Sequence, residues 1–159
     1  MDRVDLGLLA ALEKNGRQSF ATLAELSGMS KTSVWSRVQT LEETGVIRNY
    51  RAVIDPALIG LKLTAYVNIM IDFSKRDSFE KSVMSNPAVV ECFTTAGEAD
   101  YIMRIICRDV SQLDNILRYN ISLMPGVQRS TTIMCLKSIK QDASLVDTCE
   151  KMDLLLPNR

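Results

Sequence analysis

The 159-residue sequence contains no histidine, and this absence removes several classes of function at once. Histidine is the commonest general base in enzymes, so catalysis by Ser-His or Cys-His pairs is excluded. The four cysteines, Cys92, Cys107, Cys135 and Cys149, include no Cys-x-x-Cys pair, and a zinc site without histidine would need distant thiols alone. We therefore expect no metal site and no cofactor, and we interpret the cysteines as small core thiols.

Long apolar runs are also missing. No run reaches the length of a transmembrane helix, and the stretch Met1-Asp2-Arg3-Val4-Asp5 lacks the basic and then apolar pattern of a signal peptide. The contents of 47% hydrophobic and 24% charged residues are typical of a globular protein with a packed core. The sequence thus predicts a cytoplasmic protein with no membrane partner.

The sequence also lacks an excess of positive charge. The formal net charge is +0 and the pI is about 6.3, whereas a simple nucleic-acid-binding domain is usually strongly basic. If this protein binds DNA, its positive charge must be local, and oligomerisation must multiply a weak contact.

The first 50 residues predict three helices. Val4, Leu8, Leu9 and Leu12 recur at helical spacing, Asp2 and Asp5 suit the start of that helix, and Asn15-Gly16 suits its end. Ser19 caps a short second helix with Leu23 and Leu26 as its apolar anchors, and Gly28 breaks it. A third helix runs from Ser30 to about Thr44 with Val34, Val38 and Leu41 buried, and Gly45 ends it. This order is typical of a helix-turn-helix domain, which we assign to residues 1–50.

Residues 51–60 are predicted to form a hinge that contains a short strand. Both Val46-Ile47-Arg48-Asn49-Tyr50 and Ala52-Val53-Ile54 are strand-like, and Asp55-Pro56 indicates a turn. The strands beside the three helices would make the first domain a winged helix-turn-helix.

Residues 61–140 predict a ferredoxin-like βαββαβ domain, so that the whole chain is of the α+β class. Leu63 to Ile71 alternates apolar and polar residues, as a strand does. Helices are expected over 77–84 and 109–123, and further strands over 89–95, 101–107 and 127–137. Right-handed crossovers place both helices on one face of the sheet.

The other face of this sheet is expected to bind a second copy of the chain. Tyr101-Ile102-Met103 and Ile105-Ile106-Cys107 are apolar on both faces of their strand, so self-association at least to a dimer is expected. The tail, residues 141–159, contains a helical patch of Leu145, Val146, Cys149 and Met152 that would pack on a neighbour.

The outer side of the third helix is the first candidate site. Its side chains, with two arginines just beyond the helix, are types that bind phosphates and base edges: Lys31, Thr32, Ser33, Ser36, Arg37 and Gln39, followed by Arg48 and Arg51. A plain solvated helix face is the alternative. Trp35 is interpreted as a packing residue beside the buried stripe.

The turn from Thr94 to Tyr101 is the second candidate site. Amides around Gly97 and threonine hydroxyls suit a carboxylate, and Glu98 or Asp100 suits an ammonium group, so the turn could hold a zwitterion. An ordinary hairpin turn shaped by Asp100 is the alternative. Acid-base catalysis by Glu91, Glu98 and Asp100 is a further candidate, but no nucleophile motif, phosphate loop or metal cluster supports it and we assign no catalytic residue.

Several segments in order resemble the Lrp/AsnC family, the leucine-responsive and asparagine-related regulators. The resemblance covers nearly the whole chain and rests on five segments: Asp2-Arg3-Val4-Asp5, Leu26-Ser27-Gly28-Met29-Ser30, Arg37 through Ile47, Gly97-Glu98-Ala99-Asp100-Tyr101 and Met124-Pro125-Gly126-Val127. It implies a regulator that binds double-stranded DNA through residues 31–44. It also implies a homodimer that assembles further, often to an octamer, and binds an amino acid between subunits. By position, the implied effector residues are Thr94, Gly97, Asp100, Val110, Ile133 and Met134.

The sequence departs from the family at two points. The family often has a proline within Ser30-Lys31-Thr32-Ser33, and this chain has none. Ala99 stands where a larger residue is common, which alters the volume of the implied pocket. Two alternatives to a sequence-specific, effector-sensing regulator remain: an enzyme resembling tetrapyrrole decarboxylases of related fold, and an architectural DNA-binding protein that senses nothing.

Overall fold

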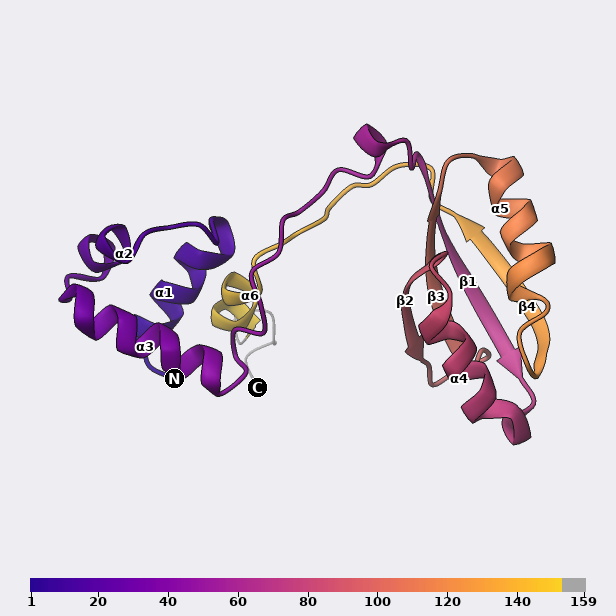
Figure 1. Cartoon of the computed structure of the whole chain (residues 1–159), viewed down its shortest axis with the longest axis horizontal. Coiled ribbons are helices and arrows are strands. Elements are labelled where there is room, and N and C mark those ends of the chain that lie inside the picture. Colours follow the sequence, from indigo (N-terminus) through magenta and orange to yellow (C-terminus); the bar gives the residue numbers. More distant parts are fainter. Residues whose placement is uncertain (153–159) are drawn as a thin grey trace, which may run out of the picture. The chain divides into compact units, whose positions relative to one another are not determined.

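The computed structural model describes residues 1–152, and it divides the chain into two compact units. The first unit comprises Met1–Val53 together with the chain from Ile139 onward, and the second comprises Ile54–Ser138. Figure 1 shows the three N-terminal helices of the first unit and the sheet with its two helices in the second. No helix within residues 1–152 is long and apolar enough to span a bilayer.

The three predicted N-terminal helices are confirmed as α1 (Arg3–Lys14), α2 (Phe20–Ser27) and α3 (Lys31–Glu43). Side chains placed just before each helix accept hydrogen bonds from its free amides, as the sequence predicted for Asp2, Ser19 and Ser30. Asp2 and Asp5 form a reciprocal capping box, with bonds of 2.8 and 3.0 Å. Gly28 ends α2 in the left-handed conformation that glycine adopts without strain (φ 66°).

The core of the first unit is formed by Leu8, Leu23, Val34 and Val38, all nearly inaccessible to solvent. Leu26 is not part of this core: its expected role as an anchor of α2 is wrong, because 66% of its surface is exposed. The inner side of α2 is formed by Phe20, Leu23 and Ala24 instead. Leu26 therefore lies at the edge of the contact between α2 and α1.

The two short strands expected after α3 are also wrong. Residues 46–54 form no strand, and the hinge contains only a short 3₁₀ turn, Ala57–Ile59. A strand requires a hydrogen-bonded neighbour, and no segment of residues 1–152 pairs with these residues. Ile47 is held instead by its amide, which donates to the carbonyl of Leu41 (2.9 Å) and ends α3.

The second unit has the predicted order of elements: β1 (Leu63–Ile71), α4 (Arg76–Ser85), β2 (Val89–Thr94), β3 (Tyr101–Cys107), α5 (Val110–Ile116) and β4 (Val127–Met134). All strands are antiparallel, in the order β2-β3-β1-β4. The long second helix predicted to Leu123 changes its hydrogen-bonding pattern after Ile116, and Leu117–Ile121 forms a π-helical segment.

The sheet is covered on one face only. Alternate residues of β1 and β3 are buried against α4 and α5, including Val67, Ile69 and Met103. Phe79 of α4 packs against the ring of Tyr101, with 4.8 Å between ring centroids. The opposite face carries Tyr66, Phe93 and Ile133, which are 37%, 60% and 55% exposed in the single chain.

The tail forms a short helix, α6 (Leu145–Lys151), that returns to the first unit and contacts α1. The Glu13 carboxylate of α1 accepts hydrogen bonds from the Ser144 hydroxyl (2.6 Å) and the Leu145 amide (2.7 Å). These bonds lower the pKa of Glu13. Val146 is the buried member of the expected patch, whereas Leu145, Cys149 and Met152 are largely exposed. The predicted tail extended to Arg159, but residues 153–159 lie outside those described.

Candidate nucleic-acid interface and effector site

The outer face of α3 is polar, and its orientation follows from the buried stripe. Val34, Val38 and Leu41 face the core, so Thr32, Ser36 and Gln39 project on the opposite side of the helix. Ser33 shares the first turn with Lys31, and its hydroxyl bonds to that of Ser30 (2.8 Å). The structure thus brings together the predicted residues of α3 on a single exposed helix whose N-terminus is capped. Trp35 lies beside the stripe, 49% exposed.

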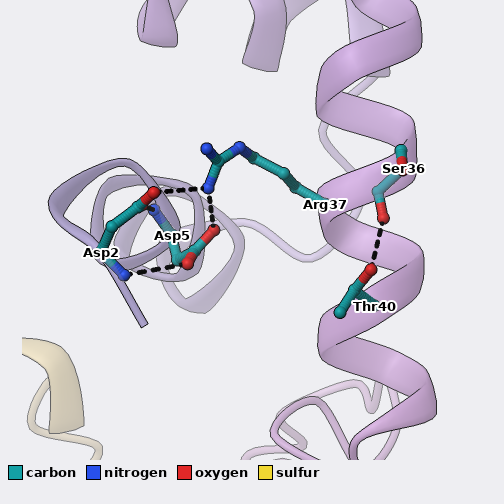
Figure 2. A network of polar contacts seen from close by, with 5 residues as sticks. All are labelled: Asp2, Asp5, Ser36, Arg37 and Thr40. Atoms are coloured by element: carbon teal, nitrogen blue, oxygen red, sulfur yellow. Dashed lines mark hydrogen bonds and ion pairs between the residues drawn. The ribbon is translucent and has the colours of Figure 1, made fainter.

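Arg37 differs from the other predicted DNA contacts because it forms ion pairs with two carboxylates at the start of α1. Its Nη1 atom donates to Asp2 Oδ2 (2.8 Å) and to Asp5 Oδ1 (2.7 Å). Figure 2 shows the side chain reaching from α3 to the first turn of α1, while the Ser36 carbonyl and the Thr40 hydroxyl bond along α3 (3.0 Å). The two carboxylates raise the pKa of Arg37. The pKa of Asp2 is lowered, first by the Asp5 amide and then by Arg37.

The remaining predicted DNA contacts have different surroundings. The Gln39 amide donates to Glu43 Oε1 (2.9 Å), one turn further along α3. Arg48 and Arg51 are exposed, and neither forms an ion pair with any residue in the range 1–152. Between them, Tyr50 donates to Glu42 (2.8 Å), and partial burial followed by this carboxylate raises the tyrosine pKa to about 12.

The turn that joins β2 and β3 is fixed largely by Asp100. Its Oδ2 atom accepts from the Ile71 amide (2.9 Å), and its own amide donates to the Ile69 carbonyl (2.9 Å). Asp100 therefore holds the turn against the end of β1. Glu98, in the same turn, forms no side-chain hydrogen bond or ion pair with the described part of the chain. The sequence offered either carboxylate for an ammonium group. In the structure Asp100 is already hydrogen-bonded to the backbone, whereas Glu98 is not bonded within the described residues.

The predicted effector residues are spread along the length of the sheet. Thr94, Gly97, Glu98 and Asp100 lie at the start of β3, whereas Val110 follows its end. Ile133 and Met134 pair with Tyr66 and Ala65, near the start of β1. A strand rises ~3.4 Å per residue, so the length of β3 separates Val110 from the turn by about 20 Å, whereas Ile133 and Met134, level with Arg104 and Ile105, lie about 10–14 Å along the strands from Tyr101. One subunit does not bring all seven residues together.

A pocket of about 480 Å³ lies beside the turn, on the uncovered face of the sheet. One wall comprises Asn68 and Met70 of β1 with Arg129 and Thr131 of β4, and the other comprises Thr95, Gly97, Glu98 and Ala99 of the turn. The sequence did not single out the four strand residues. The register of β1 with β4 places Met70 opposite Arg129 and Asn68 opposite Thr131, and this pairing has no local sequence signal.

The candidate acid-base site is not assembled. Glu91 accepts two hydrogen bonds from Arg104, at 2.8 and 2.9 Å, and Asp100 is bonded to the β1 backbone. Paired carboxylates for proton transfer require a shared substrate position, and two of these three are committed to structural bonds. The core-thiol interpretation holds for Cys107, and half-buried Cys92 packs against the same core, but Cys135 and Cys149 are exposed. Burial raises the pKa values of Cys92 and Cys107.

Comparison with known proteins identifies the family of each part of the chain. A family of winged helix-turn-helix DNA-binding domains matches residues 1–48, and the Lrp/AsnC ligand binding domain matches residues 64–145. The chain belongs to the Lrp/AsnC family. It is a DNA-binding transcriptional regulator with a winged helix-turn-helix domain and a C-terminal α+β ligand-binding domain.

Individual Lrp/AsnC proteins match over most of the chain. The Bkd operon transcriptional regulator of Pseudomonas aeruginosa is 32% identical over 142 residues, which cover 87% of this chain and 93% of that protein. A Neisseria meningitidis regulator, NMB0573, solved as a complex with L-Met, superposes with a TM-score of 0.88 at 30% identity and covers 91% of this chain and 96% of its own. The Escherichia coli AsnC structure shares the fold (TM-score 0.87, 24% identity, 92% and 98% covered).

Proposed function

We propose that this Lrp/AsnC regulator is a dimer that places two copies of α3 in successive major grooves of its operator. In this proposal Thr32, Ser33, Ser36 and Gln39 contact base edges, while Lys31, Arg48 and Arg51 hold phosphates. The observation that carries the proposal is the polar outer face of a capped helix whose apolar stripe is fully buried. The net charge is +0, so several weak half-sites must combine to give useful affinity.

We assign Arg37 a positioning role within this interface. The carboxylates of Asp2 and Asp5, at the start of α1, bind its guanidinium, so the side chain fixes the orientation of α3 against α1. A direct phosphate contact would give a different signature, because each neutralised phosphate contributes about 0.9 to the salt dependence of binding. The variants Arg37→Ala and Asp5→Ala should weaken DNA binding similarly and leave the salt slope nearly unchanged.

The DNA experiment uses the full chain with duplexes selected from a random-sequence library. Gln39→Ala should lower affinity for the selected site by about 10-fold, as expected for a lost base contact of roughly 1–3 kcal/mol, and leave binding to unrelated duplexes unchanged. Arg48→Gln should weaken both and reduce the salt slope by about 1. Lys14→Gln, an exposed lysine at the far end of α1, is the control. If the wild type bound selected and unrelated duplexes with equal affinity, sequence-specific regulation would be wrong and an architectural role would be favoured.

We further propose that the effector is an amino acid bound where two subunits meet. Val110 and the turn around Gly97 lie at opposite ends of β3, so both border one site only if different subunits contribute them. The dimer would assemble further, to an octamer, and the effector would shift that assembly through differential affinity. In this proposal the protein acts in the cytoplasm, without enzymatic activity or a membrane partner. Identical sedimentation and DNA affinity with and without a bound amino acid would contradict the coupling.

A further inference from the structure

We infer that Trp35 is a specificity-determining residue of this regulator, and that its exposed indole, with the Phe20 ring beside it, receives the 5-methyl group of a thymine in the operator. This inference rests on the proposed function, since it assumes that α3 enters the major groove. It goes beyond that function by naming a base that the protein selects and the apolar contact that selects it.

The exposure of Trp35 sets it apart from the other apolar residues of α3. Half of its surface, 49%, is exposed, whereas Val34, Val38 and Leu41 are buried. A single exposed apolar side chain is common on protein surfaces, so its place on the helix decides what it can contact.

That place is between two predicted DNA contacts. Trp35 lies four residues after Lys31 and four before Gln39, so the three side chains form one row along α3. In the proposed function Lys31 holds a phosphate and Gln39 contacts a base edge. Arg37, two residues further along, projects from nearly the opposite flank and is bonded to the start of α1 (Figure 2). Trp35 therefore borders the side of α3 that faces DNA.

A hollow of about 240 Å³ lies at this point, lined by Phe20, Lys31, Thr32 and Trp35. Phe20 begins α2 and packs against the core of the first unit, so this wall is fixed. Side chains of a helix lean toward its N-terminus, which directs the indole over the turn of Lys31 and Thr32. The hollow is smaller than the ~300–1,000 Å³ of small-molecule sites, and it suits a group as small as a methyl.

The chemistry of the lining indicates thymine. Two of the four lining residues are aromatic, and Lys31 adds the positive charge that suits a groove bordered by phosphates. Among the groups that base pairs present in the major groove, the thymine 5-methyl is the apolar one, and aromatic rings and the threonine methyl are side-chain groups that contact it. The hollow should therefore favour thymine over the other three bases at one position of each half-site.

The experiment uses the full chain and the duplex selected from a random-sequence library. Each thymine is replaced in turn by deoxyuridine, which lacks only the 5-methyl group. At one thymine of each half-site, wild-type affinity should fall by about 4-fold, the value of one buried methyl group. Loss at no thymine, or a selected site without thymine, would overturn the inference.

Three variants assign the methyl contact to its residue. Trp35→Ala should bind the thymine and deoxyuridine duplexes equally, whereas Trp35→Phe keeps an apolar ring and should retain most of the discrimination. The control is Leu26→Ala, which truncates an exposed apolar side chain of α2 outside the hollow and should discriminate as the wild type does. If the 4-fold difference persists in Trp35→Ala, another residue receives the methyl group and the inference is wrong.

Fluorescence gives a readout that requires no variant. Trp35 is the single tryptophan, so binding of the selected duplex should protect its emission from quenching by acrylamide. Unchanged quenching would overturn the inference.

The outcomes also distinguish this inference from the proposed function. If the wild type prefers the selected duplex but is insensitive to deoxyuridine, the role of Trp35 is wrong and sequence-specific binding stands. If the wild type binds selected and unrelated duplexes equally, both are wrong.

Discussion

The charged residues around Arg37 in the first unit and around Arg129 in the second differ in their bonding. In the first unit, Arg37 is bonded to Asp2 and Asp5, and Glu13 is bonded to the start of α6. In the second unit, Glu98 and Arg129 line one pocket and remain without ion-pair partners among the described residues. A helix that reads DNA must be held in a fixed orientation, whereas a site that senses a ligand must keep charges available. The charged groups around Arg37 are fixed by internal ion pairs, whereas Glu98 and Arg129 form none within residues 1–152.

The largest expected effect tests whether the two units are independent. Phe79→Ala removes a fully buried ring from the second unit and should lower its unfolding free energy by ~3–5 kcal/mol. Trp35, the single tryptophan, lies on α3 and reports on the first unit alone. In urea, the ellipticity transition should shift while the tryptophan transition stays in place.

The matched control for this experiment is Leu8→Ala, in the core of the first unit. It should shift the tryptophan transition by a similar amount. If either substitution moved both transitions together, the two units would unfold as one cooperative unit. The difference between them would then lie in the bonding of their charged residues and not in their stability.

The cap of α3 gives the next largest effect. Ser30 accepts a hydrogen bond from the Ser33 amide (3.2 Å), and Ser30→Ala should destabilise the first unit by about 1 kcal/mol. Ser30→Asp retains the acceptor and should restore most of this loss. Tryptophan fluorescence during urea unfolding measures both; equal losses in the two variants would show that the cap bond contributes nothing.

Loss of the contact between α6 and α1 should have a smaller effect, confined to α6 itself. Glu13→Ala removes the acceptor of the Ser144 and Leu145 bonds, so the amides of residues 145–151 should exchange with solvent faster than in the wild type. Glu13→Gln keeps an acceptor and should exchange at an intermediate rate. Unchanged exchange in Glu13→Ala would mean that packing of Val146 alone holds the helix.

The smallest expected effect is on how the stability of the first unit falls with pH, through the ion pairs of Arg37 with Asp2 and Asp5. The folded pKa of Asp2 is below its ordinary 3.8, so its contribution to stability is present above that value and is lost as the pH falls through the folded pKa. Arg37→Gln should flatten the fall of the tryptophan transition in acid, and Arg17→Gln should not. An identical acid profile for all three proteins would exclude Arg37 as a source of this dependence.

The sequence correctly predicted those helices and strands that are determined by neighbouring residues in the chain. Ser19 and Ser30 precede apolar helical patterns. From Leu63 to Ile71, aliphatic residues alternate with Thr, Tyr, Asn and Met, and this period of two predicts a strand with one buried face. The strands expected at 46–50 and 52–54 were wrong because strand propensity does not supply a partner strand.

The site was predictable only in part, since its residues meet through distant contacts. The motif around Gly97 identified the turn, but not which carboxylate the turn itself uses. Arg37 bonds to residues 32 and 35 positions away, and no local pattern indicates that pairing. Arg129 joins the pocket because β4 pairs with β1, with an irregularity between Met70 and Ile71 that shifts the register.

The hydrogen bonds between Glu13 and residues 144–145 also bear on how the chain folds during synthesis. Because Ser144 follows Glu13 by 131 residues, the ribosome must complete the entire ligand-binding unit before α6 emerges and docks. The ligand-binding unit is thus an insertion within the DNA-binding unit. The entropic cost of closing a loop grows with its flexible length, and an insertion that has already folded leaves only short connectors to be ordered. Docking of α6 on α1 is therefore favoured once the ligand-binding unit has folded.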